Sequence, residues 1–247
     1  MKIMSWNIKN GGAVFHCKDR DYKPIPSNIN NILATIRKEN PDILVLQEFQ
    51  YQYWDRLIEN GLKKDGYRNF LFYEDYLNEE HDGANGVLLC NKLGQWNMLP
   101  RPADIYEYTY RNWCEVELPD KNLRLLAVDV PLEEEFHGVK DIKKRKAFLE
   151  DGLKRRFLEY RDMETPAVIL GDFNLFITED GETSTLSEYL SFFEDTLVSL
   201  VKGTTWGNHQ NDYIFGNAAF VNLVQSGHEE PVRTSYSDHN YLIVEIA

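Results

Sequence analysis

The chain has 247 residues, of which 43% are hydrophobic and 13% aromatic, enough apolar material to fill a substantial core. Its 40 acidic and 27 basic residues give a formal net charge of -13, which argues against a protein that coats duplex DNA by bulk electrostatic attraction. Because no apolar run is long enough to span a bilayer and the N-terminus lacks a signal-peptide pattern, we expect a cytoplasmic protein without membrane insertion.

Short apolar runs and helical patterns alternate along the whole chain. Runs rich in Val, Ile, Leu and aromatic residues, bounded by Gly, Pro, Asn or Asp, are typical of β-strands. The predicted strands are Lys2–Asn7, Asp42–Leu46, Asn69–Glu74, Gly86–Asn91, Trp113–Leu118, Leu123–Val130, Ala167–Leu170, Asp212–Phe215, Ala219–Leu223 and Asn240–Ile246.

Apolar residues that recur with helical spacing predict four helices. They are a helix that starts near Ser27 and stops before Pro41, one around Trp54–Ile58, a long one from Ile142 to Phe157, and Thr183–Phe193. Nine of the 27 basic residues lie between Lys140 and Arg161, where they indicate either a solvated helix face or a phosphate-binding track.

The organisation of these elements predicts a single domain over residues 1–247, because no Gly/Ser/Pro-rich linker or repeat divides the chain. About ten strands and four helices fit two packed sheets with helices on their outer faces. Several consecutive strands lack a helical crossover, which favours mixed or antiparallel sheets over a doubly wound parallel sheet.

Polar side chains follow the ends of many predicted strands. Carboxylates, amides and an imidazole gathered at strand ends are what metal-assisted attack on a phosphate ester requires. The segments concerned are Trp6-Asn7, Gln47-Glu48, Gly171-Asp172-Phe173-Asn174, Asn211-Asp212-Tyr213, Ser237-Asp238-His239 and, as a weaker member, Thr205-Trp206.

The chemistry of each residue type gives it a candidate role. Glu48 at the mouth of a buried strand costs desolvation energy unless a hard cation such as magnesium compensates it. The amide oxygen of Asn7 can ligate or position a metal, or it can cap a turn. Asp172 is suited to orient or deprotonate a water, and Asn174 to hold a phosphate oxygen, although Gly-Asp-Phe-Asn is also an ordinary turn sequence.

Asp212 and His239 are natural partners. A carboxylate holds an imidazole in one tautomer and stabilises its protonated form, which can donate a hydrogen bond to the charge that grows on phosphoryl oxygens. The alternative is that His239 is a structural or exposed loop histidine.

In their order and spacing, these segments resemble the endonuclease/exonuclease/phosphatase superfamily, whose members include deoxyribonuclease I and exonuclease III. The resemblance implies an α+β fold, a four-layered α/β/β/α sandwich of two mainly antiparallel sheets with the site at one edge. The matching segments are Ser5-Trp6-Asn7-Ile8, Pro41-Asp42-Ile43 through Gln47-Glu48, Gly86-Val87-Leu88-Leu89, Ala167 to Asn174, Asn211 to Phe215 and Ser237-Asp238-His239.

The same resemblance implies Mg2+ or Mn2+ at Glu48 and Asn7, with Asp238 assisting at or beside the metal. It also implies that Asp172 activates the water and Asn174 contacts phosphate. Asp212 would orient His239.

One departure from the family pattern follows the strand Leu123–Val128, where many members place a His or Tyr that contacts the scissile phosphate. Here Asp129 or Pro131 occupies that place. If Asp129 binds substrate, its negative charge beside an anion costs free energy unless a metal neutralises it. Lys9 likewise stands where some nucleases carry an acidic residue.

These observations lead to a metal-dependent phosphoester hydrolase, with nuclease as the preferred activity and nucleic acid or a small phosphorylated molecule as the partner. A phosphatase or phosphodiesterase for a small molecule or lipid head group is the alternative, and a catalytically inactive binding protein on the same fold is a third hypothesis. No obligate protein partner is indicated. The cluster Tyr106, Tyr108, Tyr110, Arg111 and Trp113 fits either a groove for a nucleic-acid strand or a strand with buried aromatics.

Overall fold

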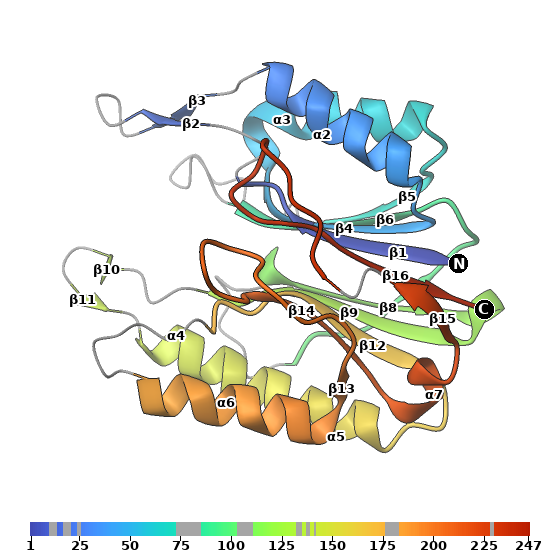
Figure 1. Ribbon diagram of the computed structural model, residues 1–247, viewed down its shortest axis with the longest axis vertical. Coiled ribbons are helices and arrows are strands. Elements are labelled where there is room, and N and C mark those ends of the chain that lie inside the picture. The colour runs from blue at the N-terminus through green and yellow to red at the C-terminus, as the bar shows by residue number, and fades with distance from the viewer. Residues whose placement is uncertain are drawn as a thin grey trace.

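The computed structural model describes residues 1–9, 14–16, 21–23, 26–72, 85–102, 111–131, 135–136, 139–140, 142–175, 183–227 and 230–247. Two six-stranded sheets lie face to face, and helices cover the outer face of each sheet (Figure 1). This arrangement confirms the expected four-layered α/β/β/α sandwich. In the described part of the chain, no helix is long and apolar enough to cross a bilayer.

The first sheet contains both ends of the chain. Its strands, in spatial order, are β15 (Val224–Gly227), β16 (Leu242–Ile246), β1 (Lys2–Asn7), β4 (Ile43–Gln50), β6 (Asn85–Asn91) and β5 (Asn69–Leu71). Strands β1 and β4 are parallel, and the other neighbours are antiparallel. Helices α2 (Pro26–Glu39) and α3 (Tyr51–Lys64) cover its outer face (Figure 1).

The second sheet repeats this plan with one parallel pair, β9 and β12. Its strands, in spatial order, are β13 (Val198–Ser199), β14 (Asp212–Gly216), β12 (Ala167–Asp172), β9 (Leu123–Asp129), β8 (Trp113–Leu118) and β7 (Asn97–Met98). The helices on its outer face are α4 (Ile142–Ala147), the π-helical turn η3 (Phe148–Lys154), α5 (Arg155–Arg161) and α6 (Thr183–Thr196).

Smaller elements complete the described chain. They are the strand pairs β2 (Val14–His16) with β3 (Asp21–Lys23) and β10 (Glu135–Phe136) with β11 (Val139–Lys140), the short helix η2 (Pro119–Lys121), and α7 (Ala218–Val221).

The apolar runs of the central strands are continuous because both faces of each sheet are buried. In β12, Val168 and Leu170 pack between the sheets, whereas Ala167 and Ile169 pack against the helices. The same alternation in β4 directs Val45 inward and its neighbours toward the outer helices. The result is three apolar layers that hold the two sheets in a fixed relation.

The strand predicted at Ala219–Leu223 is wrong, because the structure has helix α7 there and strand β15 only afterwards. Asn217 caps this helix, since its side-chain oxygen accepts the N–H of Phe220 at 2.9 Å and that of Ala167 at 3.1 Å. These contacts favour a helical turn that buries Phe220 in the core between the sheets. Composition alone could not distinguish the two, because a short apolar run suits either element.

At Gly171, strand β12 lies very close to the backbone of β9. Its φ is +140°, and a Cβ added there would lie 1.9 Å from the carbonyl oxygen of Val128 on β9. We expect Gly171→Ala to lower the free energy of unfolding by about 3 kcal/mol or more, because backbone strain and overpacking add. Urea denaturation measures the change.

Gly66→Ala is the matched control. Gly66 also has a positive φ, +95°, but nothing lies within 4 Å of the place that an alanine methyl would take. Only the backbone term applies, and we expect a loss of about 1–2 kcal/mol. Equal losses in the two variants would contradict the close approach of β12 to β9.

Candidate active site

The predicted functional residues meet at one edge of the sandwich, where the carboxyl ends of both parallel strand pairs lie. In the first sheet, Asn7 at the end of β1 is the cross-strand partner of Gln47, the residue before Glu48. In the second sheet, Asp172 at the end of β12 is the cross-strand partner of Asp129 at the end of β9.

The side chain of Asn7 connects these two ends. Its Nδ2 donates to Oε1 of Glu48 at 3.0 Å and to Oδ2 of Asp172 at 2.9 Å. Its Oδ1 accepts the backbone N–H of Lys9 at 3.0 Å. Because a backbone N–H can only donate, this bond fixes the orientation of the amide. Asn7 therefore presents a hydrogen-bond donor to both carboxylates.

Left-handed backbone shapes the site. Lys9, Glu48 and Asn174 have φ values of 48°, 52° and 49°. The register of β4 against β6 shifts between Leu46 and Phe49, so Glu48 lies in a bulge. Such a bulge turns a side chain out of the regular strand alternation, and non-glycine residues with positive φ are typical of functional sites.

The turn after β12 is held by its own side chains. The backbone N–H of Asn174 donates to Oδ1 of Asp172 at 2.9 Å, and Nδ2 of Asn174 donates to the carbonyl of Val130 at 2.8 Å. The guanidinium of Arg145, which is buried on α4, donates to the carbonyl oxygen of Asn174. The turn therefore presents Asp172 in one orientation.

Sequence reasoning missed Arg145 because it lies in the basic segment between Lys140 and Arg161. A signal was present, since Arg145 stands four residues before Leu149 and so continues the apolar stripe of that helix through Leu153 and Phe157. A charged residue on a buried stripe indicates a specific partner.

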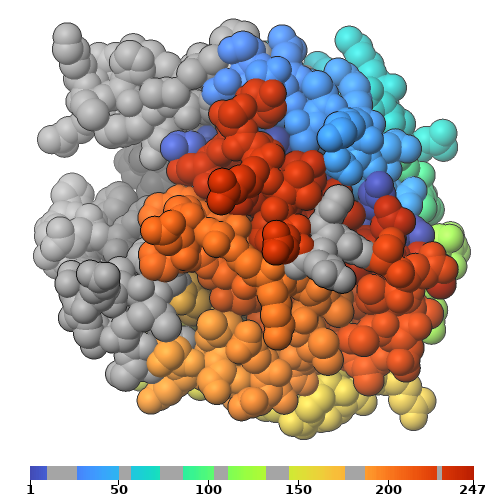
Figure 2. All heavy atoms as spheres, viewed as in Figure 1, coloured from blue at the N-terminus to red at the C-terminus, as the bar shows by residue number. Residues whose placement is uncertain are grey.

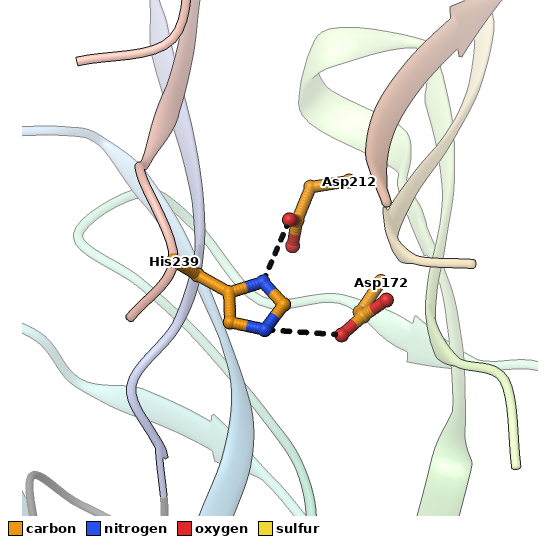
Figure 3. A group of neighbouring side chains, drawn as sticks. All are labelled: Asp172, Asp212 and His239. Carbon is orange, nitrogen blue, oxygen red and sulfur yellow. Dashed lines mark hydrogen bonds and ion pairs between the residues drawn. The ribbon is translucent and has the colours of Figure 1, made fainter. Parts of the chain in front are cut away.

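His239 lies between two carboxylates (Figure 3). Its Nδ1 is 2.8 Å from Oδ2 of Asp212, and its Nε2 is 3.9 Å from Oδ2 of Asp172. The loop that carries His239 is fixed to the first sheet, because Ser237 Oγ donates to the carbonyl of Asn7 at 2.7 Å and accepts the N–H of His239 at 3.1 Å. The imidazole thus shares a hydrogen bond with Asp212 and faces Asp172.

Thr205 sets the start of β14. Its Oγ1 accepts the backbone N–H groups of Asn211 at 2.8 Å and Asp212 at 3.0 Å. The ring of its neighbour Trp206 lies with its centroid 6.4 Å from that of His239. Thr205-Trp206 is thus a structural support beside the His–Asp pair.

The surroundings of His239 and Asp172 shift the pKa values of both side chains, so that His239 holds its proton more strongly than Asp172 does. Burial lowers the pKa of His239, but the charge and hydrogen bond of Asp212, with the charges of Asp172 and Glu48, raise it to about 10. Burial and the Asp212 charge raise the pKa of Asp172 to about 7, although His239, Asn7 and the Asn174 N–H oppose them. At neutral pH the imidazole is therefore a donor, while Asp172 can exchange a proton.

Asp129 lies beside this group and is buried. Burial, followed by the charges of Asp172 and Glu48, raises its pKa well above the usual range, and Arg111 and the Glu48 N–H oppose that shift. Asp238 is further out at the rim, where one of its oxygens is 2.8 Å from Nζ of Lys9. The structure thus places Asp129 among the other carboxylates and pairs Asp238 with a lysine.

Among the described residues, two groups offer ligand atoms for a cation. Asp172, Asp212 and His239 bring theirs within 4.8 Å of one another. However, the imidazole shares a hydrogen bond with Asp212 and holds its proton, and a protonated imidazole is a poor ligand. Glu48, Asp129 and Asp172 form the second group. Their negative charges repel one another, and this repulsion favours the binding of a hard divalent cation near them.

Part of the predicted aromatic–basic cluster lies outside the described residues, namely Tyr106, Tyr108 and Tyr110. Of its other members, Trp113 is buried against the helices of the second sheet. Arg111 is half-buried and acts on Asp129. The buried-strand interpretation therefore holds for Trp113.

Known proteins share this fold over its whole length. A family model described as Endonuclease/Exonuclease/phosphatase family matches residues 4–239. An AP endonuclease from Archaeoglobus fulgidus aligns with a TM-score of 0.70 at 14% identity, covering 100% of this chain and 99% of that one. A variant of the 3' phosphatase NExo from Neisseria, bound to product DNA hairpin, aligns with a TM-score of 0.72 at 16% identity and the same coverage.

A third structure has a higher sequence identity. An endonuclease/exonuclease/phosphatase from Beutenbergia cavernae aligns with a TM-score of 0.64 at 23% identity, covering 99% of this chain and 70% of that one. No curated protein sequence matches the chain.

Asp212→Asn tests the cause of the His239 shift. Without the Asp212 charge, we expect the pKa of His239 to fall from about 10 toward its ordinary value of about 6.5. An NMR pH titration of the imidazole in chelator-containing buffer measures it, with the signal assigned from the spectrum of His239→Gln. A midpoint that stays near the wild-type value would contradict this assignment.

The same pair links stability to pH. Because the pKa of His239 is raised in the folded state, protonation of His239 contributes to the free energy of unfolding. This contribution is full below about pH 6.5 and is lost as the pH rises through about 10. We expect the free energy of unfolding to fall more steeply between pH 7 and 10 in the wild type than in Asp212→Asn.

Proposed function

Because the chain belongs to the endonuclease/exonuclease/phosphatase family, we propose that it is a divalent-metal-dependent phosphoester hydrolase and, more narrowly, a nuclease. Enzymes of this family hydrolyse phosphoester bonds and generally depend on a divalent metal. The observation that carries the proposal is the buried His239–Asp212 pair, which faces Asp172 across 3.9 Å at the edge where Asn7 bridges Asp172 to Glu48.

In the proposed reaction, Asp172 accepts a proton from the attacking water. Its pKa of about 7 suits a general base at neutral pH, and Asn7 together with the backbone of Asn174 holds both of its oxygens in place. The water oxygen then bonds to phosphorus in line with the ester oxygen that leaves. Asn174 is the residue that contacts the phosphate.

His239 stabilises the charge that develops on the phosphoryl oxygens. Asp212 holds the Nδ1 proton, so Nε2–H of the imidazolium points toward the site and donates there. Such a donor acts most strongly in a place from which water is excluded, and both residues of the pair are buried.

The cation site of the proposal comprises Glu48 and Asn7, with Asp238 beside them. Mg2+ or Mn2+, when bound, polarises the phosphoryl group and lowers the pKa of water. Glu48 is the carboxylate that the bulge in β4 turns toward this place. Asn7 orients Glu48 through Nδ2, so it positions the ligand whether or not it also touches the cation.

Nucleic acid is the proposed substrate class. The AP endonuclease and the DNA-bound 3' phosphatase, which share the fold, support this choice. The net charge of -13 supports the second candidate, a phosphatase or phosphodiesterase for a small phosphorylated molecule, because an acidic surface repels long polyanions.

Hydrolysis of bis(p-nitrophenyl) phosphate with Mg2+ or Mn2+ tests the reaction. We expect Asp172→Asn and His239→Ala each to lower kcat by about 100-fold or more, since each removes a proton-transfer or charge-stabilising group. Chelation should abolish turnover. Asp195→Asn, on the exposed face of α6, is the matched control and should keep full activity.

Two results would refute the assignment. Full activity of Asp172→Asn would remove the proposed base. Absence of metal-dependent turnover in the wild type on every phosphoester tried would leave the inactive binding protein as the better interpretation.

A substrate panel tests the nuclease proposal. We expect single- or double-stranded oligonucleotides to be cleaved with higher kcat/KM than nucleotides, sugar phosphates or lipid phosphates. Because few phosphates would be contacted by so acidic a chain, KM should rise less than about tenfold between 50 and 200 mM salt. A clear preference for a small phosphomonoester would favour the second candidate instead.

A further inference from the structure

The rings of three residues form a row that leads outward from the active site. The ring of Trp206 lies with its centroid 6.4 Å from that of His239 and 6.3 Å from that of His209. The ring planes of Trp206 and His209 differ by 24°, so these two rings are close to parallel. His239 is buried, Trp206 is half-buried and His209 is exposed. The row therefore runs from the imidazole of the site to the surface of the protein.

The backbone holds the outer part of this row, because Trp206 and His209 are the two ends of a tight turn. The N–H of Trp206 donates to the carbonyl of His209 at 3.0 Å, and the N–H of His209 donates to the carbonyl of Trp206 at 2.8 Å. Gly207, inside the turn, has a φ of +52°, which a glycine adopts without strain. The side chain of His209 thus projects from a turn that main-chain bonds and a glycine hold in shape.

A second set of bonds fixes the turn to the segment of the catalytic imidazole. The N–H of Asn240 donates to the carbonyl of Thr205 at 2.8 Å, and its Nδ2 donates to the carbonyl of Thr204 at 2.8 Å. Asn240 directly follows His239, and Thr205 directly precedes Trp206. The ring of Trp206 is therefore held in a fixed relation to the imidazole.

Partly exposed rings beside a phosphoester site suit a nucleobase. Stacking of bases on aromatic side chains contributes to affinity without relying on charge, which matters for a chain with a net charge of -13. In a duplex the bases are already stacked on their neighbours, whereas the bases of an unpaired strand can be splayed out onto a protein surface. The rings and the charge together favour an unpaired strand over a duplex.

We propose that Trp206 and His209 form a stacking platform for the bases of an unpaired nucleic-acid strand, beside the phosphate on which His239 acts. The platform supplies affinity through ring contacts and fixes the position of the nucleotide next to that phosphate. This inference rests on the proposed phosphoester hydrolase function and narrows its substrate class.

Because Trp206 also supports the imidazole, the decisive variant is His209→Ala. Fluorescence anisotropy of a labelled oligothymidylate, in buffer with chelator to prevent cleavage, measures its affinity. We expect His209→Ala to weaken binding about tenfold, the effect of one lost base stack, and His209→Phe, which keeps a flat ring, to stay within about twofold of the wild type. Asn208→Ala, which is exposed in the same turn, is the matched control and should bind as the wild type does.

Two further ligands separate stacking from charge. An abasic oligomer of the same length keeps the phosphates but has no bases, and a duplex of matched length has its bases paired. His209→Ala should change the affinity for either ligand by less than about twofold, and the wild type should bind both more weakly than the oligothymidylate. Circular dichroism confirms that each variant folds, and His209→Gln replaces His209→Ala if the latter does not.

Each contrary outcome overturns a defined part of the proposal. Unchanged affinity of His209→Ala for the oligothymidylate means that there is no platform at His209. An equal loss on the abasic oligomer means that His209 does not act by stacking, and an equal loss on the duplex removes the preference for an unpaired strand. If thymidine monophosphate binds the wild type as tightly as the oligothymidylate does, the occupant is a single nucleotide and the strand is wrong.

The platform and the proposed function can fail separately. A wild type that binds the strand through His209 but hydrolyses no phosphoester refutes the proposed function and leaves the platform intact. Metal-dependent hydrolysis by the wild type, with normal strand binding by His209→Ala, refutes the platform alone.

Discussion

The amide of Asn7 is the contact on which the arrangement of the site depends. It lies at the end of a strand in the first sheet, and its Nδ2 reaches Glu48 in that sheet and Asp172 in the other. Without this donor, two carboxylates from opposite sheets would face each other with only repulsion between them. The Lys9 N–H holds the amide in place, and Ser237 attaches the His239 loop to the backbone of Asn7.

The carboxylates at this edge differ in function because they differ in what surrounds them. Asp212 is committed to the imidazole and keeps it protonated, whereas Asp172 lies just beyond hydrogen-bonding reach of the same ring. Asp129 has Arg111 and the Glu48 N–H as its opposing groups. The cost of burying these carboxylates is offset by local hydrogen-bond donors and cations. The net charge of the whole chain does not offset it.

Much of this could be read from the sequence, since strand periodicity and the polar residues at strand ends predicted both sheets and brought together Asn7, Glu48, Asp172, Asn174, Asp212 and His239. What escaped prediction depends on contacts between distant segments. The bulge at Glu48 is a register shift of β4 against β6. The backbone of Arg111 lies so close to β6 that only the glycine at position 86 leaves room for it. Helix α7 replaced a predicted strand because Asn217 binds a residue of β12. A local pattern does not contain such partners.

The pairing of β1 with β16 determines when the site can form during folding. In the space-filling view, the C-terminal segment (red) lies between the blue N-terminal layer and the orange layer below it (Figure 2). Strand β16 is the antiparallel neighbour of β1, and the bond from Ser237 to Asn7 joins residues 230 positions apart. Contacts of such separation close the longest loops and form late in folding. A nascent chain that has not yet released residues 237–246 therefore holds Asp172 and Asp212 but no imidazole between them. The site comes into existence only once the segment that carries His239 has been made and has joined β1.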